Sequence, residues 1–295
     1  MGAFRRRGNQ VTRSRRSIAL AVSLCLATLA SPLAGRAAPP LRFRTLAAAA
    51  PAWYTPELHA QVLAAGDRGV TMPDAVNIPA AGVAFLGIRP GQQIIIGTLN
   101  SFTLCTSNFV FRNGSNYAIG TAGHCGNVGQ PVTMILAPRL ALNIGKVIMS
   151  TGDAGVGNDF ALISIKRSLN SIVSPSMAAW GGPTRAYTSS SAPLAVKHIG
   201  WGLGIGAGGT PRIGIGTVMT STVWGMIGVT NKGDSGGPAN TGDNRALGNI
   251  THIACCQYGT HTAVGTTIAR ILQIAGGWTL ATCKKATPWP LYGCP

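Results

Sequence analysis

The sequence is poor in acidic residues, in histidine and in long hydrophobic runs. Its 295 residues include 7 Asp and Glu against 24 Lys and Arg, and only 5 histidines. No apolar run reaches the ~18 residues of a confident membrane-spanning helix. The basic residues are scattered and do not alternate with aromatic ones, so no specific nucleic-acid site is predicted. With so few acids and histidines, a motif that combines both rarely arises by chance.

Three short segments supply, in chain order, a histidine, an aspartate and a serine: Thr121–Cys125, Asn158–Leu162 and Gly233–Pro238. A serine hydroxyl is a poor nucleophile at neutral pH, so it needs an imidazole to take its proton and a carboxylate to orient that imidazole. Ser235, His124 and Asp159 fit these three catalytic roles. The glycines around the serine permit a tight turn in which the N–H groups of Gly233 and Ser235 converge as an oxyanion hole.

Two other aspartates compete for the carboxylate role. Asp153 lies among glycines six residues before Asp159, which favours a solvated turn. Asp159 directly precedes the apolar run Phe160–Ile163, as expected for a carboxylate that enters a buried strand. We therefore assign the role to Asp159. Taken singly, each motif has an ordinary alternative, such as a simple turn around Ser235 or a metal-ligand pair at His124 and Cys125.

Together the three segments resemble those of the chymotrypsin-fold serine peptidases, in particular the secreted bacterial branch that includes the streptogrisins and alpha-lytic protease. The resemblance extends over about residues 101–278. It implies an all-β fold of two antiparallel six-stranded β-barrels, with the active site between them and a short C-terminal helix. It also implies that Asp234 is buried and supports the oxyanion loop, and that a bridge from Cys105 to Cys125 anchors the histidine loop.

Local patterns agree with an all-β fold. The chain has 40 glycines and few charges, and short runs rich in β-branched and aromatic residues are bounded by turn formers. Residues 168–183, rich in Ser, Asn, Pro and Gly, are the expected crossover between the barrels. Helical spacing is found only at Thr266–Ile274. A substrate would lie extended and add a strand to the edge near Thr251–Ile253.

The chain ends fall outside the two-barrel region, which we place at residues 92–278. Residues 1–37 carry seven arginines around the apolar stretch Ile18–Ala30, with small residues before a possible cleavage point, and are predicted to be an export signal. Residues 38–91 are a propeptide, an extension or a linker, and residues 279–295 form a tail. Without the signal, 17 basic residues face 7 acidic ones. We expect a secreted bacterial protein with no membrane span, whose charge favours anionic cell-surface polymers.

Cysteine usage suits the same compartment. Cys25 would leave with the signal, and six cysteines remain: Cys105, Cys125, Cys255, Cys256, Cys283 and Cys294. In an exported protein these are expected to form disulfides. Cys255 and Cys256 are adjacent, so a bridge between them is strained and each is expected to pair with Cys283 or Cys294. Zinc is the competing use of four cysteines, but an adjacent pair lacks the usual ligand spacing.

Substrate preference is read from the residues near the nucleophile. In the family, the residue six before the serine lies at the base of the specificity pocket, and here it is Val229. Valine lacks the carboxylate that would bind lysine or arginine, so non-tryptic cleavage after a medium apolar residue is expected. The alternative is glutamate recognition by His252 and Lys232. Thr251 and His252 belong to the expected substrate strand.

The sequence therefore predicts a secreted serine endopeptidase that cleaves polypeptide substrates through an acyl-enzyme, with no cofactor and no metal. Two alternatives remain from other classes. One is an esterase or acyl transferase, because triad geometry alone does not select amide over ester. The other is a non-catalytic homologue that binds through the cleft or the tail.

Overall fold

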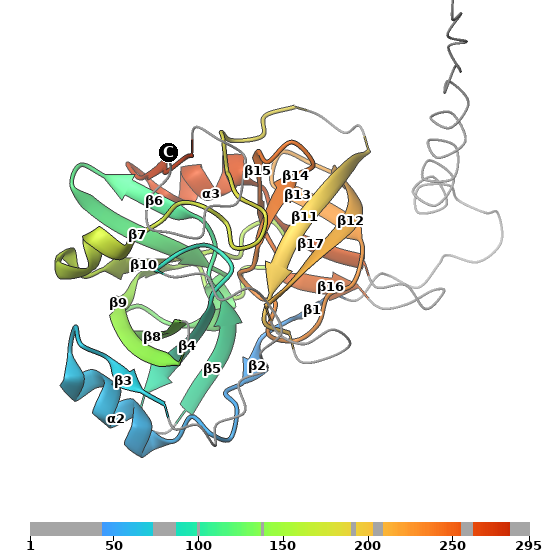
Figure 1. Ribbon diagram of the computed structural model, residues 1–295. Coiled ribbons are helices and arrows are strands. Elements are labelled where there is room, and N and C mark those ends of the chain that lie inside the picture. The colour runs from blue at the N-terminus through green and yellow to red at the C-terminus, as the bar shows by residue number, and fades with distance from the viewer. Residues whose placement is uncertain are drawn as a thin grey trace, which may run out of the picture. The chain divides into compact units, whose positions relative to one another are not determined.

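The computed structural model describes residues 43–72, 87–98, 101–136, 139–189, 193–202, 209–254 and 262–283. The predicted export signal lies outside these residues. The described strands form two sheets in which every neighbouring pair is antiparallel, seen in Figure 1 as a green and a gold-to-orange group. Each sheet folds into a barrel, as the resemblance implied.

The first barrel carries the segment with His124 and the segment with Asp153 and Asp159. Its strands are β4 (Gln93–Thr98), β5 (Ser101–Thr106), β6 (Val110–Asn113), β7 (Asn116–Thr121), β8 (Pro131–Leu136), β9 (Leu140–Ser150) and β10 (Ala161–Ile165). They pair in the order β6-β7-β10-β9-β8-β4-β5. Because β5 leads into β6 after three residues, the two ends of this path are one bent strand. The barrel therefore has six strands.

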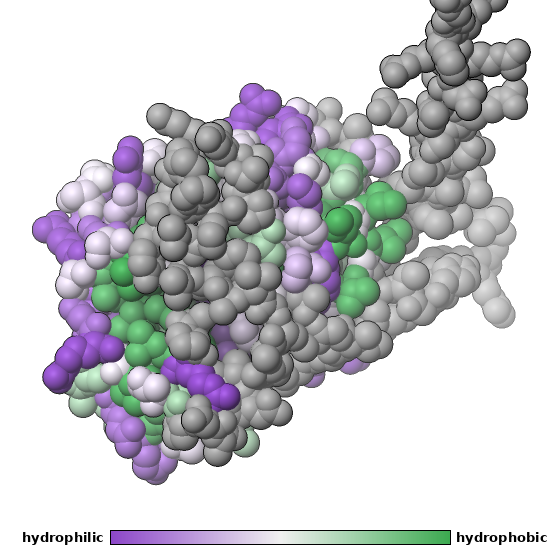
Figure 2. Space-filling view, in the orientation of Figure 1, coloured by the Kyte–Doolittle hydropathy of each residue, from purple (hydrophilic) through white to green (hydrophobic). Residues whose placement is uncertain are grey.

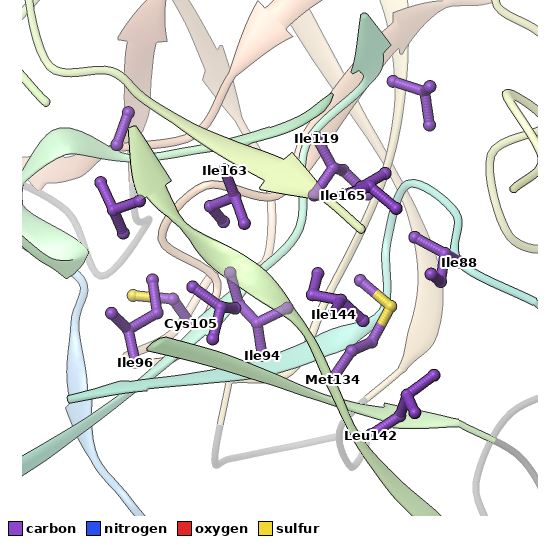
Figure 3. Close-up of a cluster of buried hydrophobic side chains, with 14 of the residues drawn as sticks. Ile88, Ile94, Ile96, Cys105, Ile119, Met134, Leu142, Ile144, Ile163 and Ile165 are labelled. Carbon is purple, nitrogen blue, oxygen red and sulfur yellow. The ribbon is translucent and has the colours of Figure 1, made fainter. Parts of the chain in front are cut away.

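The alternation of side chains along β4 explains how this barrel is filled. Ile94 and Ile96 are buried in the interior cluster with residues such as Ile119, Met134 and Ile163 (Figure 3). Ile95, between them, is buried in a different cluster on the outer side. A period of two sends successive side chains to opposite faces of a sheet, so both faces of β4 are covered.

The second barrel carries the serine motif. Its strands are β11 (Leu194–Gly200), β12 (Thr210–Val218), β13 (Val223–Ile227), β14 (Pro238–Thr241), β15 (Ala246–Asn249), β16 (His252–Ala254) and β17 (Thr262–Thr266). They pair in the order β16-β17-β13-β12-β11-β14-β15. Here β15 and β16 are the two halves of one bent strand, so this barrel also has six strands. Trp224, Met226 and Leu247 are prominent in its buried core.

The barrels are joined by the segment between β10 and β11. It contains a short 3-10 helix, η2 (Arg167–Ile172), and runs through the predicted crossover region. The predicted C-terminal helix is α3 (Ile268–Ala275), which begins after Thr267, whose side chain accepts a hydrogen bond from the backbone N–H of Arg270. The chain then returns to the first barrel through β18 (Thr279–Leu280), which pairs with β6.

Residues 43–72 are folded onto both barrels. β1 (Phe43–Thr45) pairs with β16 of the second barrel. β2 (Ala48–Ala49) and β3 (Val70–Thr71) pair with β5 and β9 of the first barrel. Between them, α2 (Pro56–Ala65) starts after the cap residue Thr55. In Figure 1 this segment, in blue, runs from β16 to the outer side of the first barrel.

Hydrophobic side chains reach the surface in a few places. In Figure 2 one green area overlies the region of β12. On this strand the side chains of Ile213 and Ile215 are 61% and 44% exposed. Their spacing of two places them on one face of the strand. Among the described residues, no helix combines the length and the apolar character needed to cross a lipid bilayer.

Candidate active site

The first barrel places His124 and Asp159 at the same end of neighbouring strands. β7 ends at Thr121, and the following 3-10 helix η1 (Gly123–Cys125) carries the histidine. Asp159 immediately precedes the buried run that begins at Phe160. Because Thr121 pairs with Ala161 across β7 and β10, the two motifs are brought together by strand register.

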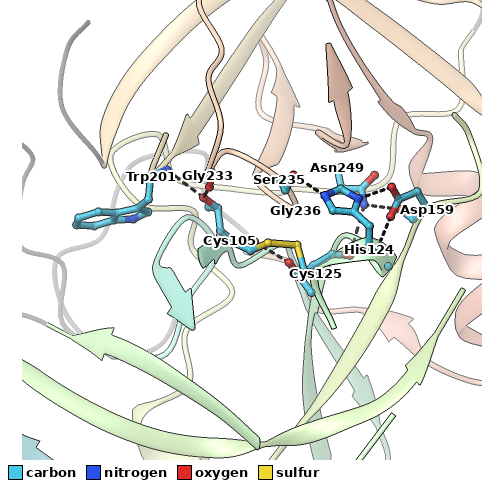
Figure 4. The surroundings of a disulfide bond; sticks show 12 residues. Cys105, His124, Cys125, Asp159, Trp201, Gly233, Ser235, Gly236 and Asn249 are labelled. Carbon is cyan, nitrogen blue, oxygen red and sulfur yellow. Dashed lines mark hydrogen bonds and ion pairs between the residues drawn. A yellow bond between two sulfur atoms is a disulfide. The ribbon is translucent and has the colours of Figure 1, made fainter. Parts of the chain in front are cut away.

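The structure joins the three predicted residues in one hydrogen-bonded line (Figure 4). Nδ1 of His124 lies 2.5 Å from Oδ2 of Asp159, and Nε2 of the same ring lies 2.7 Å from Oγ of Ser235. The backbone N–H of His124 also donates to Oδ1 of Asp159, at 3.1 Å. A carboxylate on one ring nitrogen favours a proton there, so the other nitrogen can accept the serine proton.

Asp159 is fully buried, and its backbone is held from the second barrel. Its N–H donates to Oγ1 of Thr266 at 3.2 Å, and its carbonyl accepts from Nδ2 of Asn249 at 2.9 Å. Oδ1 of Asn249 in turn accepts from the N–H of Thr266. Asn249 and Thr266 are not predicted as site residues from the sequence. Nothing in their local sequence distinguishes them, because their role depends on contacts across the barrels.

The serine lies on a tight loop that contains Gly233 and Gly236. Both glycines have positive φ, +99° and +85°, which side chains rarely tolerate. A Cβ on Gly233 would also lie 2.7 Å from the carbonyl oxygen of Trp201. These positions therefore require glycine. Ser235 itself has no exposed surface.

Asp234 is fully buried beside the serine, as the resemblance implied. Its two oxygens accept hydrogen bonds from both terminal nitrogens of Arg212, each at 2.8 Å. They also accept the backbone N–H groups of Gly202 and Asn231 at 2.7 and 2.8 Å. A bidentate guanidinium and two backbone donors satisfy the carboxylate in place, which fixes the loop that carries Ser235. Arg212 was not found from the sequence, because its position opposite the loop depends on strand register.

Two polar residues of the first barrel hold the same loop from the other side. The Thr106 N–H donates to the carbonyl of Ser235 at 2.8 Å, and its hydroxyl donates to the carbonyl of Gly233 at 2.8 Å. Nδ2 of Asn108 donates to the carbonyl of Gly236 at 3.0 Å. Both residues follow Cys105 closely in the sequence. Polar residues placed directly after a cysteine that is expected to be bridged were the one local signal that could have indicated this role.

The backbone N–H of Gly233, a predicted oxyanion donor, donates to the carbonyl oxygen of Leu46. The N–H of Leu46 donates to the carbonyl of Thr251 at 3.3 Å. Leu46 is fully buried within the core of the second barrel. Part of the N-terminal segment therefore lies in the predicted active site, a placement that the sequence does not predict.

The four predicted substrate-binding residues are placed differently. Thr251 is buried, and His252 is 4% exposed on β16, at the predicted substrate edge. Val229 is 55% exposed, and it is absent from the buried cluster that contains Leu46. Lys232 is exposed. The position of Val229 was inferred by counting back from Ser235, and the intervening loop turns this side chain toward solvent.

Asp153, the rival carboxylate, is exposed and approaches His252 and not His124. Nε2 of His252 lies 3.3 Å from Oδ1 of Asp153, and its Nδ1 lies 2.8 Å from Oγ1 of Thr251. Both ring nitrogens of His252 are therefore engaged. Ligand atoms of Asp153, Asp159 and His252 also lie within 4.8 Å of one another. We assign no metal there, because a cation would compete with His124 for Asp159.

One further histidine lies behind the loop that carries Ser235. His198 on β11 pairs in register with Arg212, is fully buried, and its two ring nitrogens have no hydrogen-bond partner. Burial, with a smaller contribution from the charge of Arg212, lowers the pKa of His198 from 6.5 to about 3. A second cation beside Arg212 would be costly, so this ring stays neutral.

The bridge implied by the resemblance is present between Cys105 and Cys125. Figure 4 shows it directly beside the histidine. Cys283 is also disulfide-bonded, near the carbonyl of Gly182. The other predicted disulfide residues, Cys255, Cys256 and Cys294, lie outside the described residues, so the pairing at the C-terminus stays a prediction.

No family model matches the chain, and no curated protein matches it either. Several solved structures do match the chain. Protease A of Thermobifida fusca is 20% identical, with a TM-score of 0.45, over 68% of this chain and 100% of that one. The chymotrypsin of Cellulomonas bogoriensis is 20% identical, with a TM-score of 0.45, over 66% and 100%. A glutamic acid specific serine protease, described as using a histidine triad in substrate binding, is 18% identical, with a TM-score of 0.49, over 66% and 100%.

Proposed function

We propose that this chain is a serine endopeptidase in which Ser235 is the nucleophile, His124 the general base and Asp159 the residue that orients the base. The observation that carries the proposal is the unbroken line from Asp159 through His124 to Ser235, at 2.5 and 2.7 Å. Nucleophile and base are within the range needed for proton transfer, and the base is oriented by a third group.

In the proposed reaction, His124 takes the proton of Ser235 as the hydroxyl attacks the scissile carbonyl carbon. The N–H groups of Gly233 and Ser235 stabilise the oxyanion. His124 then protonates the leaving amine, and a water molecule, deprotonated by the same ring, releases the acyl group. The rigid support of the loop by Arg212 and Thr106 keeps these donors aligned before the substrate arrives.

A peptide is favoured over a simple ester because the site lies beside a strand edge. β16 already pairs with an extended segment of polypeptide, through the register from Phe43 opposite Ala254 to Thr45 opposite His252. Backbone pairing of this kind recognises peptides. Cleavage after Lys or Arg is disfavoured, because the buried cluster next to the site is apolar. Glutamate recognition by His252 is also disfavoured, since both its ring nitrogens are engaged.

A fluorophosphonate probe tests the nucleophile directly. We expect the probe to label the protein once, on Ser235, and to fail with Ser235→Ala and with His124→Ala. Hydrolysis of a matched peptide amide and ester separates peptidase from esterase activity. Labelling elsewhere, or full activity of either variant, would overturn the assignment. Export of the chain, predicted from residues 1–37, is tested separately by N-terminal sequencing of protein from the culture medium.

A further inference from the structure

The segment from Phe43 to Ala49 crosses the site from one barrel to the other. On the second barrel, Phe43, Arg44 and Thr45 pair antiparallel with β16. On the first barrel, Ala48 pairs with Leu104 and Ala49 with Thr103, both on β5. The chain is therefore extended on both sides of the catalytic serine, with Leu46 and Ala47 in the middle.

The backbone of Leu46 makes two contacts that single out its carbonyl group. Its N–H donates to the carbonyl of Thr251 at 3.3 Å, which continues the β1–β16 pairing. Its carbonyl oxygen accepts the N–H of Gly233, the residue that opens the tight loop of Ser235. A strand that served only to cover the edge of β16 would have no need to place a carbonyl on this donor.

The side chains of the segment differ in how deeply they are buried. Phe43 and Arg44 are exposed, while Leu46 is fully buried beside apolar residues of the second barrel. Ala47 packs against the interior cluster of the first barrel, which includes both bridged cysteines. The segment is thus recognised by its backbone and by one large apolar side chain, in the way that a pocket recognises the residue before a scissile bond.

Ser235 has no exposed surface in this structure. An external peptide needs the edge of β16 and the N–H of Gly233, and both are already occupied. The enzyme as described therefore cannot take an external substrate by this route until the segment leaves. The hydroxyl of Ser235 is nevertheless 2.7 Å from its base, so the catalytic groups are assembled around the segment.

We propose that the bond between Leu46 and Ala47 is the enzyme's own first substrate, cleaved by Ser235 of the same molecule; this rests on the proposed peptidase function. Oγ of Ser235 bonds to the Leu46 carbonyl carbon, the carbon–nitrogen bond to Ala47 breaks, and His124 passes the serine proton to the Ala47 nitrogen. Water then adds its hydroxyl to the acyl carbon and its proton to His124, and Ser235 is regenerated. The products are a Leu46 carboxylate and an Ala47 amine.

The two products are held very differently. The chain after the bond stays on the first barrel through β2, β3 and a buried cluster that includes Tyr54, Val62 and Met72. The hydroxyl of Tyr54 also donates to Thr133 at 2.7 Å. The described residues before the bond are held by β1 and Leu46 alone. Cleavage therefore frees the edge of β16 and leaves Ala47 as the new amino terminus, and leucine should also be favoured before the bond in external peptides.

The test follows the full chain by intact mass and N-terminal sequencing. We expect the wild-type protein to begin at Ala47 and the Ser235→Ala protein to keep its Leu46–Ala47 bond. Leu46→Asp should slow the cut at least about 100-fold, because an unpaired carboxylate enters an apolar site. Leu63→Asp is the matched control, since Leu63 lies on α2 of the same segment and is 38% exposed. We expect Leu63→Asp to be cleaved between Leu46 and Ala47 at the wild-type rate.

Kinetics and an external substrate distinguish the possible outcomes. Cleavage within one molecule gives a first-order rate that is unchanged when the protein is diluted. A rate that falls in proportion to concentration would overturn cleavage in the same molecule. A protein that reacts with the fluorophosphonate and hydrolyses a leucine peptide amide, but keeps its Leu46–Ala47 bond, would overturn this inference and leave the peptidase function standing. Failure of both readouts in the wild type and also in Leu46→Asp, whose segment is held less tightly on the site, would overturn both proposals.

Discussion

The two barrels hold their proposed catalytic residues by different means. In the first barrel, Cys125 follows His124 and ties it covalently to Cys105. In the second barrel, Asp234 precedes Ser235 and ties it by a buried ion pair to Arg212. A disulfide is broken by reductant, whereas a buried ion pair between a carboxylate and a guanidinium is not. One site thus depends on two tethers with separate vulnerabilities.

The largest expected effect comes from replacing the proposed catalytic residue that each barrel contributes, His124 in the first barrel and Ser235 in the second. Ser235→Ala and His124→Ala should each lower kcat/KM on a leucine peptide amide by at least about 10⁴-fold, because neither group works without the other and because the uncut segment stays on the site. The double variant should be no worse than the worse single variant. The melting temperature of each variant should stay near that of uncut protein. Losses that multiply in the double variant would show that the two residues do not act as a unit.

The next effect tests the ionic tether. Arg212→Met leaves Asp234 fully buried without its guanidinium and also removes donors to the carbonyls of Gly200 and Val229. The free energy of unfolding should fall by roughly 3–5 kcal/mol. Urea unfolding in the Ser235→Ala background measures this loss without interference from self-cleavage.

A matched surface pair provides the control for this prediction. Arg245 lies 2.8 Å from Asp243, whose side chain is 56% exposed. Arg245→Met should cost no more than about 1 kcal/mol, since water replaces the lost partner. If Arg212→Met and Arg245→Met lower the free energy of unfolding by the same amount, then the burial of Asp234 does not increase the contribution of its ion pair to stability.

The sequence was sufficient for the parts of the site that are local in the chain. The settings of His124, Asp159 and Ser235 predicted residues that the structure brings together, and the six-stranded barrels followed from the resemblance. Arg212, Asn249 and Thr266 were missed because each acts on a residue far away in the sequence, at a position set by strand register. Sequence patterns record which residues alternate on a strand, but not which strand lies opposite.

The N-terminal segment shows a second limit of sequence reasoning. From the sequence, residues 38–91 can be a propeptide, an extension or a linker, since an alanine-rich run has weak periodicity. The start of α2 did carry a signal, namely Thr55 followed by Pro56 and Glu57. The placement of Leu46 carried none, because the contacts that hold it come from the proposed active site and not from the composition of its own segment.

The covalent tether should give a somewhat smaller effect than the ionic one. Replacing Cys105 and Cys125 together by alanine opens a loop of 20 residues, and the loop-entropy estimate gives a loss of about 3 kcal/mol. Reductant should lower the stability of the wild type toward that of this variant. It should leave the additional loss caused by Arg212→Met unchanged, because that tether lies in the other barrel. Alkylation of Cys125 in untreated protein would contradict the bridge.

The smallest effect concerns pH and is specific to the second barrel. The pKa of His198 is lowered from 6.5 to about 3, by burial and by Arg212, so the folded state resists a proton that the unfolded state accepts. The resulting stability is fully present above pH 6.5 and is lost as the pH falls toward 3. At pH 5 the loss is about 2 kcal/mol, at 1.36 kcal/mol for each pH unit below 6.5. In the Ser235→Ala background, His198→Met should remove this part of the pH dependence between pH 7.5 and 5, as measured by urea unfolding. If the free energy of unfolding of His198→Met changes with pH as steeply as that of the parent protein, then His198 takes up its proton in the folded state as well. The second barrel would then tolerate a second cation beside Arg212.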